Sequence, residues 1–314
     1  MNGRLIFAAI ATAAAAALGG CMVATDPNSG PNDGSMLRAN RSLTSVTFIG
    51  HSTTLIQMDG VNILTDPYYG MTIMGTGRYQ APGVAWKDLP EIDVALISHS
   101  HLDHLNYYTL YRLPSTATII APATLTYLFD DRNIQAKLLF LKAGQKTRIK
   151  EVTIAAEEVY HPNSRWLFGE DMGTLGYVIE GRDYNVLFVG DAGPGSEPCK
   201  KIGERHRIDV AILPIGPIIE LMRHVHQWPG DALDAFAETG ARVMIPVHWG
   251  TWRYAEYPRH SVNVLKRETA VRGLEKHVLV LEHGDTALFA PRRADDPVRR
   301  LTAAPPSHEE GANP

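Results

Sequence analysis

Short apolar segments separated by turn-forming residues dominate the middle of the chain. Residues 94–98 form an apolar run of the kind found in strands that are buried on both faces. Residues 54–58 and 61–65 are joined by Asp59-Gly60, a two-residue signal for a β-hairpin. Similar runs predict further strands at 46–49, 117–121, 138–141, 152–156, 175–180, 185–190, 209–214, 242–247, 278–282 and 286–290.

Two segments between these strands favour helices, at 123–131 and at 229–240. The second begins at Pro229, carries its apolar residues on one face and stops at Gly240, as helices commonly do. No repeat of fixed period is present. Strands in both halves of the chain, with helices between them, predict a layered α/β body.

Composition sets limits on the domains and the partners. The chain has 314 residues, of which 45% are hydrophobic and 20% charged, so it can build a globular core. Its net charge of −4 and the lack of a basic stripe argue against a nucleic-acid partner. Residues 21–42 and 292–314 contain few apolar residues, so we expect a flexible tether over 21–42, a folded domain over 43–291 and a disordered tail over 292–314.

The first 20 residues have the pattern of a signal peptide. Arg4 precedes an apolar stretch at 6–18 that is too short to cross a membrane. Leu18-Gly19-Gly20-Cys21 resembles a bacterial lipobox, which implies a lipoprotein signal peptide over 1–20 and acylation of Cys21. The alternative is an ordinary secretion signal followed by an incidental cysteine.

Lipidation of Cys21 would leave Cys199 without a disulfide partner, since the chain has two cysteines. From the signal peptide and the lipobox-like sequence we expect an exported bacterial lipoprotein, anchored in a membrane and facing the periplasm. Met22 is not an aspartate-type retention signal, so the outer membrane is the default location.

The most informative segment is His99-Ser100-His101-Leu102-Asp103-His104, directly after the apolar run. Catalytic groups gather in loops at strand ends, and imidazole and carboxylate groups are ligands of divalent metals. In an extended chain His99 and His101 point the same way and can bind one ion. Asp103 and His104 can then turn toward a second ion. The spacing predicts a two-metal centre rather than a solvated polar loop.

Three more residues of ligand type, His161, Asp191 and His248, each come directly after an apolar run. Each is weak evidence alone, because a single histidine is more often on the surface or in the core. Together with the segment 99–104 they predict one shared site. A carboxylate such as Asp191 would bridge two cations about 3.5–4 Å apart.

The segment 99–104 resembles the signature of the metallo-β-lactamase-fold superfamily. Five stretches, in order along the body, are similar to its branch that hydrolyses N-acylphosphatidylethanolamine as a phospholipase D: 48–53, 64–67, 89–93, 190–193 and 248–251. This resemblance implies a four-layer αββα sandwich of the α/β class. It also implies a membrane-anchored phosphodiesterase for phospholipid-like substrates that acts through a metal-bound hydroxide.

The resemblance implies seven ligands for two divalent ions, namely His99, His101 and His161 for one ion, Asp103, His104 and His248 for the other, and Asp191 between them. Zinc is the expected metal, with iron or manganese as the alternative at one position. Catalytic roles are implied for Asp103 and Asp191, and for His226 rather than His224. His51 stays open between a role in catalysis and a structural role.

The substrate is the least determined part of the prediction. Two apolar segments, 67–74 and 218–222, fit contact with acyl chains, but equally fit packing onto the core or onto a second copy in a homo-oligomer. Ala192 stands where the family often has threonine, so one hydroxyl is lost. The alternatives are a lactonase or sugar-phosphate hydrolase of a sister branch, and a non-catalytic metal-binding envelope lipoprotein.

Overall fold

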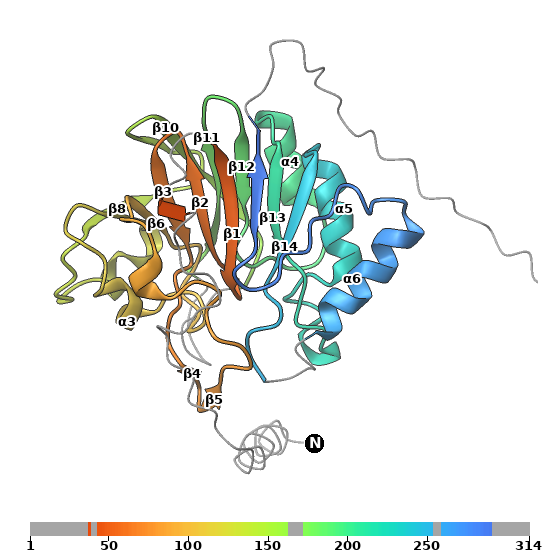
Figure 1. Cartoon of the computed structure of the whole chain (residues 1–314), viewed down its shortest axis with the longest axis horizontal. Helices are drawn as coiled ribbons and strands as arrows, with labels where there is room; N and C mark the ends of the chain where they lie inside the picture. Colours follow the sequence, from red (N-terminus) through yellow and green to blue (C-terminus); the bar gives the residue numbers. More distant parts are fainter. Residues whose placement is uncertain (1–36, 39–42, 163–171, 254–258, 291–314) are drawn as a thin grey trace, which may run out of the picture.

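Two mixed sheets packed face to face form the centre of the structure, a computed structural model that describes residues 37–38, 43–162, 172–253 and 259–290 (Figure 1). In the described residues the first sheet has seven strands, in the order β15 (Thr286–Phe289), β1 (Thr44–Gly50), β2 (Thr53–Met58), β3 (Val61–Thr65), β6 (Val94–Leu96), β7 (Thr118–Pro122) and β8 (Lys137–Leu141). The strands from β15 to β3 are antiparallel, and those from β3 to β8 are parallel.

The second sheet has six described strands, in the order β14 (Val243–Val247), β13 (Val210–Pro214), β12 (Asn185–Phe188), β11 (Thr174–Glu180), β10 (Val152–Val159) and β9 (Lys146–Ile149). β12, β13 and β14 are parallel, and the rest of the sheet is antiparallel. A separate hairpin is formed by β4 (Thr72–Ile73) and β5 (Thr76–Gly77).

Helices cover the outer faces of both sheets. Their bounds are α3 (Tyr107–Leu110), α4 (Glu197–Arg205), α5 (Pro229–Thr239) and α6 (His260–Val271), with 3-10 turns η2 (Trp86–Asp88), η3 (Ala123–Leu128) and η4 (Glu220–Met222). In Figure 1, α4, α5 and α6 lie beside β13 and β14, whereas α3 lies on the opposite side of the molecule. This order of layers confirms the predicted αββα sandwich.

The core follows from the two-residue period of the strands. Leu55 and Ile56 are neighbours in β2 and point to opposite faces of the first sheet. Ile56 packs in the cluster between the sheets, which includes Phe188 of the second sheet. Leu55 belongs to the cluster under α3, which includes Leu110. Both faces of the first sheet are therefore buried, which agrees with its uninterrupted apolar runs.

Two hydrogen bonds join the sheets where the loop after β6 begins. The Tyr177 hydroxyl donates to the carbonyl of Ile97 over 2.8 Å, and the Leu175 amide donates to the carbonyl of Ser98 over 3.0 Å. Both donors lie on β11 of the second sheet. The start of the segment 99–104 is thus fixed by both sheets.

The elements differ from the prediction in a few places. The predicted strand at 278–282 is wrong: only Val278 makes an isolated bridge, to Met244. The Leu279 amide still donates to the Met244 carbonyl, and a turn follows in which the Glu282 amide donates to the Asp285 carboxylate. Helices α4 and α6 were not predicted. The hairpin at Asp59-Gly60 is confirmed, and both of its residues have positive φ.

The predicted signal peptide 1–20, the lipidation site Cys21 and the tail 292–314 lie outside the described residues. Within the predicted tether, Leu37 is buried, and its carbonyl accepts from the side chain of Gln57 over 2.8 Å. In the part of the chain that the structure describes, no helix has the length and apolar character needed to span a bilayer.

Candidate metal centre

The loop after β6 brings four of the predicted ligands together. It turns at His101, whose carbonyl accepts from the amides of His104 and Leu105 over 3.1 and 2.9 Å. This turn separates His99 and His101 from Asp103 and His104, as the sequence predicted. His99 and His104 are fully buried, whereas His101 and Asp103 are partly exposed.

One group of side chains, called here the first cluster, consists of His99, His101, His161 and Asp191. Each offers one ligand atom, and these atoms lie within 4.8 Å of one another. His101 Nδ1 is 3.2 Å from His161 Nε2, which is 3.6 Å from Asp191 Oδ2. The other nitrogen of His161 donates to the carbonyl of Val225 over 2.8 Å, which fixes the ring.

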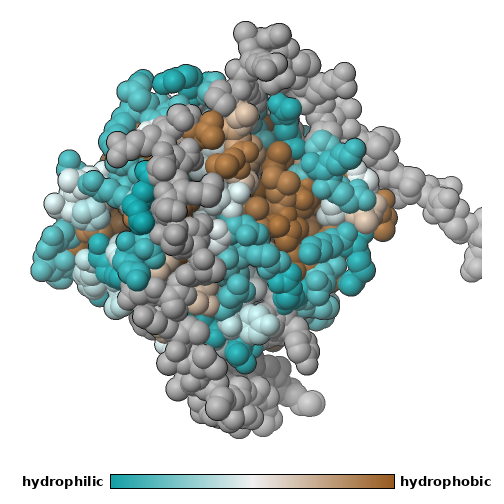
Figure 2. Space-filling view, viewed as in Figure 1, coloured by the Kyte–Doolittle hydropathy of each residue, from teal (hydrophilic) through white to brown (hydrophobic). Residues whose placement is uncertain are grey.

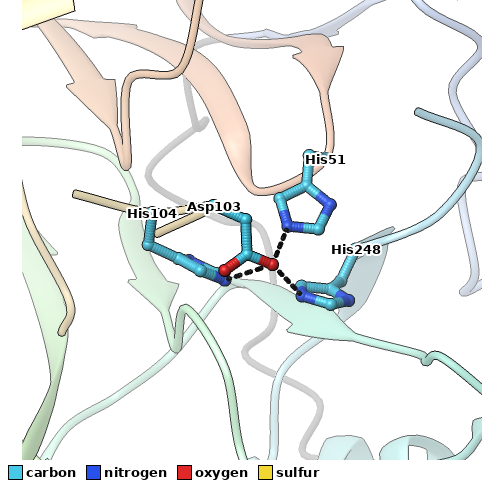
Figure 3. Close-up of side chains that lie close together, drawn as sticks. All are labelled: His51, Asp103, His104 and His248. Carbon is cyan, nitrogen blue, oxygen red and sulfur yellow. Dashed lines mark hydrogen bonds and ion pairs between the residues drawn. The ribbon is translucent and has the colours of Figure 1, made fainter. Parts of the chain in front are cut away.

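The second cluster contains the predicted ligands Asp103, His104 and His248, with His51 beside them (Figure 3). Asp103 Oδ2 lies at its centre, 3.7 Å from His248 Nε2 and 3.8 Å from His104 Nε2. The nearest nitrogen is that of His51, at 3.0 Å. The ligand-type atoms of all four residues lie within 4.8 Å of one another.

Asp191 belongs to the first cluster and also faces histidines of the second cluster. Its Oδ1 is 3.3 Å from His248 Nε2 of the second cluster. Its Oδ2 is 3.4 Å from His104 Nε2 and 3.6 Å from His161 Nε2. One buried carboxylate therefore faces both histidine groups, which is the arrangement expected of a bridging ligand.

His226 lies beside Asp191, with its Nδ1 3.5 Å from Asp191 Oδ2, and is buried. The ligand-type atoms of His226, Asp191 and His248 also lie within 4.8 Å of one another. His224, two residues earlier, is exposed. The structure thus brings His226 rather than His224 to the site.

Asp66 is a residue of the site to which the sequence analysis gave no role. Its Oδ2 accepts from His104 Nδ1 over 2.7 Å and from the Ser98 hydroxyl over 2.6 Å, while Oδ1 accepts from the Ser98 amide over 2.7 Å. Asp66 follows β3 directly, so the rule that located Asp191 and His248, a ligand-type residue just past a strand, would have found it too.

Burial and charge together set the protonation of the site. Burial favours the neutral carboxyl of Asp191, but His248, His226 and His104 outweigh it and hold its pKa well below the usual range. Burial and neighbouring histidines lower the pKa of His99, and burial together with His161 lowers that of His101 to about 4. Neutral imidazoles and ionised carboxylates are the forms that bind metals.

Burial lowers the pKa of His161 as well, whereas the pKa values of His104 and His248 are raised. Burial favours neutral rings at His104 and His248, but the carboxylates raise the pKa of His104 and raise that of His248 to about 9. Asp191 and Asp103 head the charges responsible. The carboxylates of Asp191, which is buried, and of Asp103, which is partly exposed, thus favour nearby positive charge, which divalent cations would supply.

Several polar atoms at the site are buried without a hydrogen-bond partner among the described residues: His99 Nε2, His104 Nε2, His226 Nδ1, His248 Nε2 and both carboxylate oxygens of Asp191. Buried polar groups are rarely left in this way, and a bound ion is one of the few explanations. The donor set of imidazoles and carboxylates suits zinc, iron or manganese. The residues therefore fit a two-metal centre.

Proteins of other organisms are similar to this chain over most of its folded domain. The chain is 29% identical to an N-acyl-phosphatidylethanolamine-hydrolyzing phospholipase D 1 of Caenorhabditis elegans, over 66% of this chain and 64% of that protein. An uncharacterised protein of Mycobacterium tuberculosis is also 29% identical, over 74% of this chain and 64% of its own length. The chain thus spans under two thirds of both proteins. A metal-dependent hydrolase of Exiguobacterium is 28% identical, over 66% of this chain and 87% of its own.

Among solved structures, a metallo hydrolase of the archaeon Ignicoccus hospitalis has the same fold. The TM-score is 0.61 and the identity 22%, over 80% of this chain and all of that one. Residues 61–249, more than half of the chain, match the family model described as Beta-lactamase superfamily domain. The chain therefore belongs to the β-lactamase superfamily and has the metallo-β-lactamase fold.

Proposed function

We propose that the protein is a dinuclear metal-dependent hydrolase that cleaves phosphodiesters of phospholipid-like substrates. The observation that carries the proposal is the place of Asp191, which faces the histidines of both clusters at 3.3 to 3.6 Å. A shared carboxylate of this kind serves catalysis by two ions, whereas one ion would suffice for structural support. The names of the relatives support metal-dependent hydrolysis as the reaction class.

The carboxylates and the histidines of the site have different roles in this proposal. Bound divalent ions would lower the pKa of a water toward neutrality and withdraw charge from the attacked phosphorus. Asp191 and Asp103 hold the negative charge that binds the ions. His226 is kept neutral, since burial lowers its pKa to about 3, and its Nδ1 faces Asp191. In this proposal the neutral ring of His226 would hydrogen-bond a substrate oxygen beside the centre.

Exposed apolar side chains at three places in the chain support an acyl-bearing substrate. Met74 at the β4–β5 turn is 78% exposed, Leu221 in η4 is 68% exposed, and Tyr108 in α3 is 56% exposed. In the segment 67–74, by contrast, Tyr69 is fully buried and packs in the core. The segment 67–74 thus combines core packing with an exposed side chain, whereas the residues of the segment 218–222 are partly or largely exposed.

The first test is hydrolysis of bis-p-nitrophenyl phosphate by the metal-loaded protein, which separates an enzyme from a metal-binding lipoprotein. The second is release of N-acylethanolamine from liposomes that contain N-acylphosphatidylethanolamine. Turnover of the first substrate without release from the second would remove the lipid assignment and keep the phosphodiesterase. Turnover of lactones alone, or of sugar phosphates alone, would favour the sister branches.

We also propose that acylation of Cys21 anchors the protein to a bacterial membrane, in line with its lipobox-like sequence. The anchor would keep the domain close to lipid substrates. Radiolabelled palmitate should enter the parent protein and not Cys21→Ser, and the variant should move to the soluble periplasmic fraction. Equal membrane retention of both proteins would refute the anchor.

A further inference from the structure

The turn between β1 and β2 holds His51 in an uncommon backbone conformation. His51 has a φ of 57°, in the left-handed region, and the preceding Gly50 has a φ of 141°. The side chain is 3% exposed. Non-glycine residues in this region are uncommon, and where they occur in buried segments they cluster at functional sites. In this conformation His51 contacts two of the predicted metal ligands.

The ring of His51 binds one of the predicted ligands. His51 Nε2 is 3.0 Å from Asp103 Oδ2. A dashed line marks this contact in Figure 3. An ionised carboxylate only accepts hydrogen bonds, so the ring nitrogen must be the donor. A nitrogen that carries this hydrogen cannot also bind a metal ion. His104 and His248 approach the same oxygen less closely, at 3.8 and 3.7 Å.

The backbone of His51 binds a second predicted ligand. Its carbonyl accepts from the His248 amide over 2.8 Å, and the two rings are 4.0 Å apart between centroids. His248 is itself left-handed, with a φ of 65°. One residue therefore contacts two members of the second cluster, Asp103 and His248, which come from loops of different sheets.

Thr251 and His283 hold the turn between β1 and β2 in place. The His51 amide donates to Thr251 Oγ1 over 2.6 Å, and that oxygen is 2.9 Å from His283 Nε2. A Cβ at Gly50 would lie 2.7 Å from His283 Cδ2, so this close approach requires glycine. His51 is thus held from its backbone while its ring and carbonyl face the site.

We propose that His51 is a positioning residue for the second cluster, which orients Asp103 through its ring and His248 through its carbonyl without binding metal itself. The inference rests on the proposed two-metal function. Partners that orient a ligand in this way commonly change metal affinity by about 10- to 100-fold when they are removed.

The experiment compares zinc binding by the parent protein, His51→Ala and His51→Gln, in competition with a chromophoric chelator. We expect His51→Ala to bind two ions, one of them about 10- to 100-fold more weakly. His51→Gln, whose amide can donate from a similar place, should recover part of the loss. His260→Ala removes an exposed histidine of α6 and should match the parent.

X-ray absorption of the fully loaded proteins separates positioning from ligation. The number of imidazoles per zinc should be equal in the parent and in His51→Ala. Loss of one imidazole per two zinc ions would overturn the inference, as would unchanged affinity for both ions. Should His51→Ala fail to fold by circular dichroism, His51→Asn replaces it, because asparagine tolerates a left-handed backbone.

The number of zinc ions bound by the parent protein tests the proposed function separately from the role of His51. A parent protein that binds fewer than two ions would refute the two-metal proposal itself. A parent with two ions, together with His51 variants that bind zinc in the same way, would refute only the positioning role.

Discussion

Nδ1 of His104 lies 2.7 Å from Oδ2 of Asp66, and both side chains are fully buried. Because the imidazole donates from Nδ1, its Nε2 is left to face Asp103 and Asp191. Asp66 thus fixes which nitrogen of His104 is available to a metal, although its own contacts are to His104 and Ser98.

Replacement of Asp66 tests this relationship. Asp66→Asn should weaken the binding of one zinc ion by about 10- to 100-fold and lower activity with it, because the amide no longer fixes the ring by a charged bond. Chelator competition measures the affinity. Asp130→Asn, at an exposed carboxylate, is the control. Equal affinities in the two variants would show that His104 needs no such partner.

Removal of the metal should abolish activity and lower the melting temperature, since the buried carboxylates lose their counter-charge. His101→Ala should lose bound metal and activity together, with activity falling more than about 100-fold. Metal analysis and bis-p-nitrophenyl phosphate turnover check both. Full activity of a chelator-treated preparation with no detectable metal would contradict the two-metal centre.

The metal-free protein should be most stable near pH 6.5. Burial lowers the pKa of His51 and His226 to about 3, so the unfolded chain takes up more protons as the pH falls below 6.5, and stability declines. The carboxylates of Asp191 and Asp103 raise the pKa of His248 to about 9 and also raise that of His104. The stability that both protonated rings contribute is complete below pH 6.5, and the part from His248 is lost as the pH rises through 9.

Urea unfolding of the chelator-treated protein, measured from about pH 5 to about pH 10, checks this profile. A stability that rises steadily across the range would contradict the assigned protonation states. Gln in place of His248 should flatten the alkaline decline, because it removes the group that loses its proton there.

Gly83 is the site of a close backbone approach. A Cβ there would lie 1.9 Å from the Gly284 amide nitrogen and 2.4 Å from the His283 carbonyl carbon. Neither backbone atom can move aside easily, so Gly83→Ala should lower the free energy of unfolding by about 1–3 kcal/mol. Gly77→Ala is the matched control, since no atom lies within 4 Å of its Cβ position. Equal urea midpoints for the two variants would refute the clash.

Much of the fold follows from local sequence. Apolar runs and the Asp59-Gly60 turn locate strands, because burial on both faces and a two-residue hairpin leave strong signals. Helix α5 ends before Gly240, whose φ of 65° suits glycine, as expected. Helix α4 was not predicted because, of its nine residues, only Cys199 and Ile202 are buried, and two apolar positions are too few to establish a helical period.

The sequence predicted only part of the site. The segment 99–104 and the strand ends indicated which residues meet, and the structure brings His161, Asp191 and His248 to that segment. The sequence predicted no role for Asp66, and it left His51 open between a catalytic and a structural role. The roles of both residues depend on which nitrogen of a ring faces which oxygen, and on a left-handed backbone at a turn, neither of which leaves a signal in residue type alone.

The pairing of β15 with β1 has a consequence for how the chain matures. Thr286–Phe289 pairs with a strand that begins at Thr44, so the contacts span more than two hundred residues. Until β15 pairs with β1, that edge of β1 offers its amides and carbonyls to any other chain. The first sheet thus cannot be completed during synthesis of the amino-terminal half. A chaperone that shields this edge should raise the yield of folded protein more than one that binds later strands.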